Sequence, residues 1–312
     1  MSISLCLPTY NRLPHLKNCL SSIFEGFEKE EYPYEVIIAD GGSTDGTLEY
    51  LRNLDNIKLI EQDKLTGTVK AFNTCFKIAK GDYLIPISDD FILFPKVLIK
   101  ACKLMENESQ IGLVTPRIQD SKYGNLHGMT IDSIKQYWAL FGEAFIFRSS
   151  LMTEIGYFDE TFRTYYIDLD FPLTVLKLGY TTISTKEVGF IHHRIRDEEI
   201  NSARATTRKI MKNQQEKEYI EKKWNYLQNK IGNYLRHSYL KKYKALFFKR
   251  LCSIMYYSQS LRPFVEKNNK FSNKLYDLLL EQIVVFKDKR YDYLKDFYLA
   301  QKYPEEIISS LE

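Results

Sequence analysis

Short apolar runs alternate with amphipathic stretches along the first 90 residues of the chain. The apolar runs predict buried strands at residues 3–7, 34–39, 57–61 and 83–87. The amphipathic stretches have apolar residues three or four positions apart and predict helices at residues 15–27, 44–52 and 69–79. Strands that alternate with helices indicate parallel βαβ units with right-handed crossovers, and therefore an α/β fold with a doubly wound sheet.

Polar clusters follow three of these predicted strands. They comprise residues 9–12 after the first strand, 40–45 after the second and 88–90 after the fourth. In an open α/β sheet, ligands bind beyond the carboxyl ends of the strands. We therefore expect the three clusters to line one ligand crevice.

The pattern changes near residue 200, where helical spacing becomes predominant. We predict helices near residues 204–231, 233–260, 264–286 and 289–302, forming an all-helical C-terminal region. Residues 1–200 carry 21 basic and 28 acidic side chains, whereas residues 201–312 carry 23 basic and 12 acidic ones. The resulting net charges of −7 and +11 indicate a cation site in the first part and a surface for a polyanion or a membrane in the second.

Composition narrows the class of protein. Hydrophobic residues make up 44% of the chain and aromatic residues 14%, which argues for a packed core and against intrinsic disorder. None of the five cysteines forms a CxxC pair with another. This pattern predicts buried thiols in a reducing compartment. We expect neither a signal peptide nor a membrane span, because the apolar windows are far shorter than the roughly 18 residues that a span needs. These features predict a cytoplasmic protein, with peripheral contact at the inner face of a membrane as an extension of that prediction.

Asp89 and Asp90 directly follow the fourth apolar strand. Two adjacent carboxylates repel each other unless a cation or hydrogen-bond donors compensate their charge. A hard divalent ion held by Asp90 and by phosphate oxygens is one interpretation. An ordinary acidic surface turn is the alternative when the pair is considered alone.

Other motifs stand in register with this pair. They are residues 8–12, 39–47, 79–83 and 88–90, followed by 156–160, 165–171, 178–180 and 192–193. The set resembles the inverting nucleotide-sugar glycosyltransferases of family 2 over about residues 2–195. The resemblance implies a GT-A fold with a doubly wound mixed sheet, in which a catalytic domain at 1–200 has a Rossmann-like nucleotide-binding half at 1–95 and an acceptor half at 96–200. Residues 201–312 would be a basic helical appendage.

The resemblance also implies an activity. It is the metal-dependent, inverting transfer of a hexose-like sugar from a nucleotide diphosphate donor, with UDP as the expected nucleotide, to a hydroxyl of a glycan or lipid-linked glycan. The residues implied in nucleotide binding are Pro8, Thr9, Tyr10, Asn11, Arg12, Asp40, Gly42, Lys70 and Asp89. Asp40 would accept a hydrogen bond from the ring N–H of uracil. Lys70 would supply a cation to the diphosphate, because Phe72 stands where many relatives have arginine; a solvated lysine is the equal alternative.

Asp90 matches the metal-binding position of the family's acidic motif, in which Ser88 replaces the usual first aspartate. Mn²⁺ or Mg²⁺ is the implied ion. Some relatives add a histidine ligand at the positions of His192 and His193, and an imidazole suits Mn²⁺ better than Mg²⁺. We favour His192 over His193; a histidine pair that caps the sheet is the alternative.

An inverting transfer needs a base that takes the proton of the acceptor hydroxyl. The match assigns this role to Asp168, although Ile167 replaces the preceding glutamate of the family. Asp170 is the runner-up base, and its structural alternative is a carboxylate that pairs with a cation to hold the helix start. The donor-sugar and acceptor pockets are expected to include Trp138, Gly142, Glu143 and Ala144.

The sequence leaves open both the role of the basic C-terminal region and whether the protein is catalytic. The acceptor could be a modified base in nucleic acid, which the basic C-terminal region would grip. That region could instead contact an anionic membrane, or form a helical core or a homodimer interface with solvated lysines. Finally, Ser88, Phe72 and Ile167 replace polar groups expected in the family, so a non-catalytic nucleotide-sugar-binding or scaffold protein is the alternative from another class.

Overall fold

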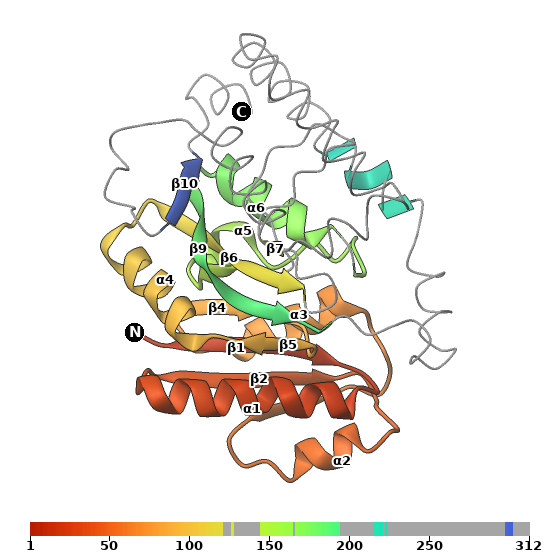
Figure 1. Ribbon diagram of the computed structural model, residues 1–312. Coiled ribbons are helices and arrows are strands. Elements are labelled where there is room, and N and C mark those ends of the chain that lie inside the picture. The colour runs from red at the N-terminus through yellow and green to blue at the C-terminus, as the bar shows by residue number, and fades with distance from the viewer. Residues whose placement is uncertain are drawn as a thin grey trace, which may run out of the picture.

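The computed structural model describes residues 1–120, 126–127, 144–164, 166–193, 215–216, 218–220, 222–223 and 297–301. In this part of the chain a single mixed sheet is covered by helices (Figure 1). Its strands are β1 (Ile3–Thr9), β2 (Tyr34–Asp40), β3 (Lys58–Glu61), β4 (Tyr83–Pro86), β5 (Phe91–Leu93), β6 (Ile111–Asp120), β7 (Leu126–His127), β8 (Ile146–Arg148), β9 (Thr181–His192) and β10 (Phe297–Gln301). Its helices are α1 (Leu13–Glu30), α2 (Thr47–Arg52), α3 (Thr68–Ile78), α4 (Pro95–Asn107), α5 (Leu151–Ile155) and α6 (Ile167–Lys177).

The sheet contains a parallel half and a mixed half. Its strand order is β10-β9-β6-β8-β4-β1-β2-β3, with β5 paired to β9 and β7 paired to β6. Strands β1 to β4 run parallel to one another, as the alternation of strands and helices predicts. Strand β8 is antiparallel to both β4 and β6 and so joins the two halves. The predicted doubly wound mixed sheet is confirmed.

Strand register brings the predicted polar clusters together. Thr9 at the end of β1 is the partner of Asp40 at the end of β2, and Asp40 is the partner of Glu61 at the end of β3. On the other side of β1, Cys6 is the partner of Pro86, so the residues that follow β4 extend beyond the same edge. The carboxyl ends of these parallel strands therefore form the crevice in which a site is expected.

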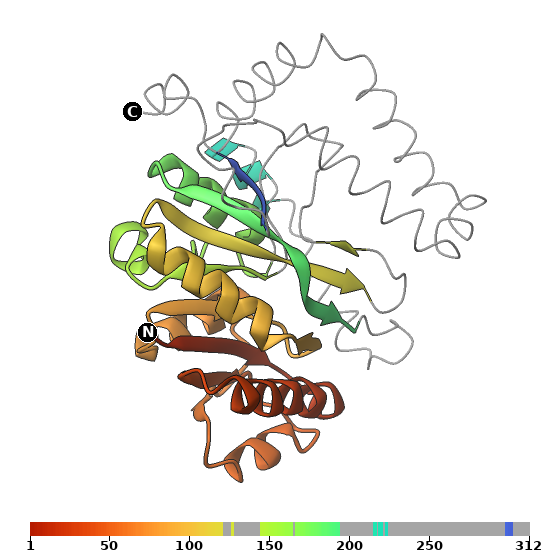
Figure 2. The same cartoon turned by 60° about the vertical axis from the view of Figure 1, so that its left-hand side comes forward.

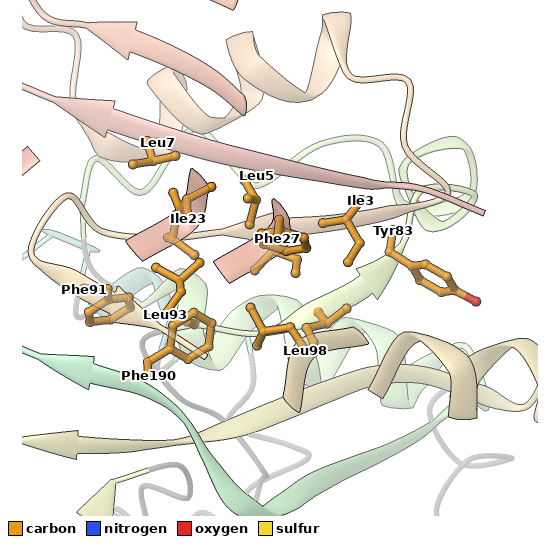
Figure 3. Packing of buried hydrophobic residues seen from close by; sticks show 14 of the residues in the cluster. Ile3, Leu5, Leu7, Ile23, Phe27, Tyr83, Phe91, Leu93, Leu98 and Phe190 are labelled. Carbon is orange, nitrogen blue, oxygen red and sulfur yellow. The ribbon is translucent and has the colours of Figure 1, made fainter. Parts of the chain in front are cut away.

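Each face of the sheet carries its own hydrophobic cluster. Side chains alternate between the faces along a strand, so Leu5 and Leu7 of β1 belong to one cluster and Cys6 to the other. Helices α1 and α4 cover the first cluster, and Figure 2 shows them on the same side of the sheet. In Figure 3, Ile23 and Phe27 of α1 reach into this cluster between β1 and α4. Helices α3, α5 and α6 contribute to the second cluster.

The strand and helix predictions hold to within a few residues in the first 90 residues of the chain, with β1 ending at Thr9 rather than at residue 7 and α2 starting at Thr47 rather than at residue 44. The prediction of an all-helical C-terminal region is wrong at its end. Residues 297–301, placed in a helix by sequence, form strand β10, which pairs antiparallel with β9. This strand contains Phe297, Tyr298 and Leu299, and aromatic residues favour a strand when a sheet edge is available for pairing.

Only a small part of the predicted C-terminal helices lies within the described residues. Residues 215–216, 218–220 and 222–223 are helical, in agreement with the helix predicted at 204–231. Within this segment Ile220 is fully buried in the second cluster, so the segment packs on the sheet domain. The helices predicted at 233–260 and 264–286 lie outside the described residues.

Two further sequence expectations concern membranes and thiols. Among the described helices, none is both long enough and apolar enough to cross a bilayer. Cys6, Cys19, Cys75 and Cys102 are buried free thiols, as predicted. The remaining cysteine, Cys252, lies outside the described residues.

Candidate active site

Arg12 joins two neighbouring carboxylates at the carboxyl ends of β1 and β4. Its Nη2 atom lies 2.6 Å from Asp90 Oδ2, and its Nη1 atom lies 3.2 Å from Asp89 Oδ1. Thr9 Oγ1 donates a 2.8 Å hydrogen bond to Asp89 Oδ2. The two aspartate side chains are only 4% and 5% exposed, so Arg12 supplies a cation to a buried pair of like charges.

The cluster keeps its charges at neutral pH. Burial raises the pKa of Asp90, but the contact with His192 and the charge of Arg12 lower it more, so that this pKa lies well below its usual range. Burial lowers the pKa of Arg12, but the charges of Asp89 and Asp90 raise it above its usual value. An ionised Asp90 is the form that can bind a cation.

Asp90 and His192 fit a divalent cation. Within the described part of the chain, no well-aligned hydrogen bond reaches Asp90 Oδ1, which is buried and lies 3.4 Å from His192 Nε2. A carboxylate oxygen beside an imidazole is a pair of ligands that suits Mn²⁺. The residues present therefore fit the implied ion. Among the described residues, no cluster of three or more potential metal ligands is found.

The two histidines differ in their positions. His192 is the last residue of β9, and its side chain is 14% exposed and faces Asp90. His193 is exposed, and its backbone N–H donates a 2.9 Å hydrogen bond to the carbonyl oxygen of Asp90. The structure thus places the side chain of His192, the favoured histidine, beside Asp90. His193 contacts Asp90 only through a backbone hydrogen bond among its described contacts.

The carboxylate of Asp40 organises the turn that follows β2. Its Oδ1 accepts hydrogen bonds from the N–H groups of Gly42 and Ser43, at 3.0 and 2.8 Å, and its Oδ2 accepts one from Ser43 Oγ at 2.6 Å. Gly42 has a φ of +84°, which explains why glycine stands there. Asp40 itself is fully buried. The contact with uracil predicted for Asp40 would therefore require this turn to open.

Residues 8–12 interlock with this turn. Asn11 Oδ1 accepts a 2.7 Å hydrogen bond from the Thr44 N–H, while the Asn11 N–H donates one of 2.8 Å to Ser43 Oγ. Asp45 accepts hydrogen bonds from the N–H groups of Leu13, at 3.2 Å, and Thr47, at 3.1 Å, and so secures the starts of α1 and α2. A Cβ atom placed on Gly41 would lie 3.4 Å from the Tyr10 ring, so the ring of Tyr10 lies over this turn. The segments that follow β1 and β2 are therefore joined by side-chain hydrogen bonds.

Helix α3 presents a surface lysine and a buried aromatic residue. Lys70 lies exposed in its first turn, the setting of a solvated lysine. Phe72, which stands where relatives have arginine, packs in the second cluster with its ring 6.0 Å from the rings of Phe76 and Phe158. Asn73 is buried and joins α3 to the loop before α6, because it donates to the carbonyl oxygen of Phe158 at 2.8 Å and accepts from its N–H at 2.9 Å.

The two candidate bases lie in the first turn of α6. Asp168 is partly exposed, whereas Asp170 is buried. Lys223 Nζ lies 2.9 Å from Asp170 Oδ1 and 2.8 Å from Asp159 Oδ2. Asp170 therefore has the cation partner that its structural interpretation requires. Ile167 packs into the second cluster in place of the acidic residue of the family.

Three of the four predicted pocket residues lie outside the described part of the chain, namely Trp138, Gly142 and Glu143. Ala144 is described and is fully buried in the first cluster. The motifs predict Arg12 as a nucleotide-binding residue and do not predict its ion pairs with Asp89 and Asp90. The repulsion between the two adjacent carboxylates is the sequence feature that indicates a nearby cation. No sequence pattern distinguishes Lys223 from the many other lysines of the basic C-terminal region.

The comparison with protein families supports the sequence motifs. Residues 4–170 match the family described as "Glycosyl transferase family 2". This range is more than half of the chain, and it contains both the Arg12 cluster and the first turn of α6.

Curated relatives match shorter regions. A dolichyl N-acetyl-alpha-D-glucosaminyl phosphate 3-beta-D-2,3-diacetamido-2,3-dideoxy-beta-D-glucuronosyltransferase of Methanococcus voltae is 37% identical over 92 residues, 27% of this chain and 27% of that protein. A poly(ribitol-phosphate) beta-glucosyltransferase of Bacillus spizizenii is 32% identical, over 36% of this chain and 19% of that protein. A dolichol-phosphate mannosyltransferase of Pyrococcus furiosus is 28% identical, over 40% of this chain and 36% of that protein. The matches thus span about a third or less of these relatives.

Solved structures share the fold. A mannosyltransferase of Pyrobaculum calidifontis, PcManGT, determined with GDP-Man and Mn²⁺, superposes with a TM-score of 0.52 at 16% identity, covering 90% of this chain and 87% of that one. TarS 1–349 of S. aureus superposes with a TM-score of 0.51 at 19% identity, covering 62% of this chain and 60% of that one. These likenesses confirm the GT-A fold.

Proposed function

The chain belongs to glycosyl transferase family 2, and from this premise we propose that it is an inverting, metal-dependent glycosyltransferase. It would move a sugar from a UDP-linked donor to a hydroxyl of a glycan or lipid-linked glycan. The observation that carries the proposal is the cluster of Arg12, Asp90 and His192, buried at the carboxyl ends of parallel strands where a nucleotide diphosphate binds in such sheets.

Asp90 and His192 would hold the divalent cation, since Asp90 Oδ1 is ionised, buried and adjacent to the imidazole. When bound, the ion would neutralise the diphosphate and stabilise the charge that develops on the leaving group. Arg12 contacts both carboxylates and holds them where the donor would bind.

Asp168 is the proposed base. The acceptor oxygen forms a bond to the anomeric carbon while the bond from that carbon to the donor phosphate breaks. The electron pair of the broken bond stays on the nucleotide diphosphate, and the proton of the acceptor hydroxyl passes to the carboxylate of Asp168. Asp170 is engaged by Lys223, which favours Asp168 for this role.

The acceptor class is supported by the names of the relatives. One is a glucosyltransferase of poly(ribitol-phosphate), and two act on dolichol-linked or dolichyl-linked substrates, as their names state. The dolichyl-linked amino sugar named for the first relative supports a lipid-linked glycan, and poly(ribitol-phosphate) is a polymer that offers hydroxyl groups.

A thermal-shift screen of UDP-glucose, UDP-N-acetylglucosamine and GDP-mannose, each with Mn²⁺ or with EDTA, tests the donor and the metal together. We expect a UDP-sugar to raise the melting temperature only when Mn²⁺ is present, because the ion links the phosphates to Asp90. The Asp90→Ala variant should lose this shift, and the surface control Asp55→Ala should keep it. Equal shifts in EDTA would overturn the metal assignment, and a shift with GDP-mannose alone would overturn the UDP assignment.

A further inference from the structure

A segment far along the chain is anchored beside the first turn of α6. It comprises the described residues 215–216, 218–220 and 222–223, drawn in cyan in Figure 1, and is called the 215–223 segment below. Ile220 is buried in the second hydrophobic cluster. The buried Glu216 accepts a 3.1 Å hydrogen bond from the N–H of Arg163 in the loop before α6. The segment is therefore fixed to the sheet domain by both apolar and polar contacts.

Lys223 closes this contact by bridging two carboxylates. Its Nζ atom lies 2.8 Å from Asp159 Oδ2, and 2.9 and 3.0 Å from the two oxygens of Asp170. Tyr219 Oη donates a further 2.8 Å hydrogen bond to Asp159 Oδ2. The side chain of Asp170 is 8% exposed, whereas Lys223 lies at the surface, so the ion pair is buried at its Asp170 end only. Lys223 thus ties the loop before α6 to the helix itself.

The first turn of α6 needs such an external tie, because its own backbone secures it poorly. Tyr166, just before the helix, has a φ of 72°, a left-handed conformation that is strained for a residue other than glycine and must be held by the surrounding structure. Pro172 lies inside the helix and has no N–H, so the carbonyl of Asp168 cannot receive the usual helical hydrogen bond from that position. The ring centroid of Phe162 lies 6.0 Å from that of Tyr166 and 5.3 Å from that of Tyr219. Phe162 therefore connects the strained Tyr166 to the 215–223 segment.

Helix geometry lets Lys223 act on this turn from the side opposite to Asp168. Residues two positions apart in an α-helix project about 200° from each other around the axis. Asp170 is buried towards Lys223, whereas Asp168 is partly exposed. A cation on Asp170 can therefore hold the turn without contacting the face of the helix that carries Asp168.

We propose that Lys223 is a positioning residue, which fixes the first turn of α6 so that Asp168 is oriented for proton transfer. The inference rests on the proposed function, in which Asp168 is the base. On this proposal the 215–223 segment supports the active site, although it lies outside the residues that match the family.

Substitution of Lys223 tests the proposal, with UDP release from UDP-glucose and from UDP-N-acetylglucosamine as the probe reactions and water as the acceptor. Lys223→Met should lower kcat about 10- to 100-fold, since a small displacement of a reacting group has costs of this order. The affinity for the donor, measured by calorimetry, should stay within about twofold, because Lys223 pairs with Asp159 and Asp170, which are not among the proposed nucleotide-binding residues. Lys223→Arg should restore most of the rate. Lys222→Met, at the exposed neighbouring lysine, is the matched control and should behave like wild type.

Two further readouts separate positioning from general stabilisation. In the background of Asp168→Asn, adding Lys223→Met should change the residual rate by less than about twofold, because the effect acts through Asp168. Hydrogen–deuterium exchange of peptides covering α6 should be faster in Lys223→Met and unchanged in Lys222→Met. If Lys223→Met fails to fold, Lys223→Gln, which keeps a hydrogen-bond donor without the charge, is measured in the same way.

The outcomes distinguish this proposal from the proposed function. An inactive Asp168→Asn together with a fully active Lys223→Met would overturn the role of Lys223 and leave the base in place. A fully active Asp168→Asn would overturn the base. If wild type releases no UDP from either sugar, the proposed donor is wrong, and the exchange of α6 still decides whether Lys223 holds this turn.

Discussion

Arg12 is the side chain on which the acidic pair of the crevice depends. It contacts Asp89 and Asp90 at once, and all three side chains are largely buried. Removing one partner of a buried ion pair leaves an uncompensated charge, which is far more costly than the loss of a surface pair.

Arg12→Met should lower the free energy of unfolding in EDTA by about 3 kcal/mol, because two buried carboxylates then lose the guanidinium that contacts both. Mn²⁺ should restore part of this loss, and so raise the melting temperature more in the variant than in wild type. Arg52→Met removes an arginine from an exposed pair with Glu61 and serves as the control, with almost no change expected. Urea unfolding with and without Mn²⁺ measures both effects. An unchanged stability of Arg12→Met would show that the pair is compensated in another way.

Asp159 makes a prediction about pH. Burial raises its pKa, but hydrogen bonds from Lys223, Thr161 and Tyr219 lower it more, to well below its usual range. A carboxylate with a depressed native pKa stabilises the fold above its unfolded pKa of about 3.9, and this contribution is lost as pH falls towards the native value.

Asp159→Asn should therefore destabilise the protein by about 1–2 kcal/mol at neutral pH and by clearly less near pH 3. Urea unfolding of wild type and variant at the two pH values gives the comparison. Asp55→Asn, at an exposed position, controls for the loss of a carboxylate as such. A difference between Asp159→Asn and wild type that stays constant with pH would contradict the ion pair.

At the scale of elements, local pattern predicts the parallel half of the sheet and fails where pairing is distant. Strands β1, β2 and β4 are buried apolar runs whose pairing follows from the βαβ rule, so sequence suffices. Strand β10 pairs with β9 from more than 100 positions away, and its aromatic residues suited a helical pattern equally well. The motifs predicted Asp90 and His192 as metal ligands, and the structure places their side chains 3.4 Å apart. The contacts of Arg12 and Lys223 depend on tertiary packing that no local pattern encodes.

Asn73 links α3 to the loop before α6 and tests how strongly these two elements are coupled. It makes hydrogen bonds of 2.8 and 2.9 Å with the backbone of Phe158 and one of 3.0 Å with Glu160 Oε1. Asn73→Ala should lower the free energy of unfolding by about 2–3 kcal/mol, because it leaves buried polar groups of the backbone without a partner.

The neighbouring Thr74 offers a matched control for this change. Its hydroxyl bonds only to the carbonyl of Lys70, one turn earlier on the same helix, among its described contacts. Thr74→Ala should therefore change stability by less than about 0.5 kcal/mol. Chemical denaturation of both variants decides the point, and equal losses would show that the amide of Asn73 has no special role.

At the scale of the whole molecule, the charge division near residue 200 acquires a partial explanation. The first 200 residues carry a net charge of −7, and the buried Asp89, Asp90 and Asp170 contribute to it. Residues 201–312 carry +11, and Lys223 shows one use of that charge, because it neutralises carboxylates of the first part. The division into a catalytic domain at 1–200 and a C-terminal region stays a prediction, and the 215–223 segment shows that the two parts are in contact.

The central claim is that this family 2 chain transfers a sugar with Asp168 as the base and the Asp90 crevice as the donor site. Its most direct test measures, on one preparation of Asp168→Asn, both the binding of a UDP-sugar in the presence of Mn²⁺ and the release of UDP from it. The account predicts donor affinity equal to that of wild type and a rate lower by about 100-fold or more, because the loss of a general base costs this much. A wild-type rate in Asp168→Asn, or loss of donor binding together with activity, would contradict it.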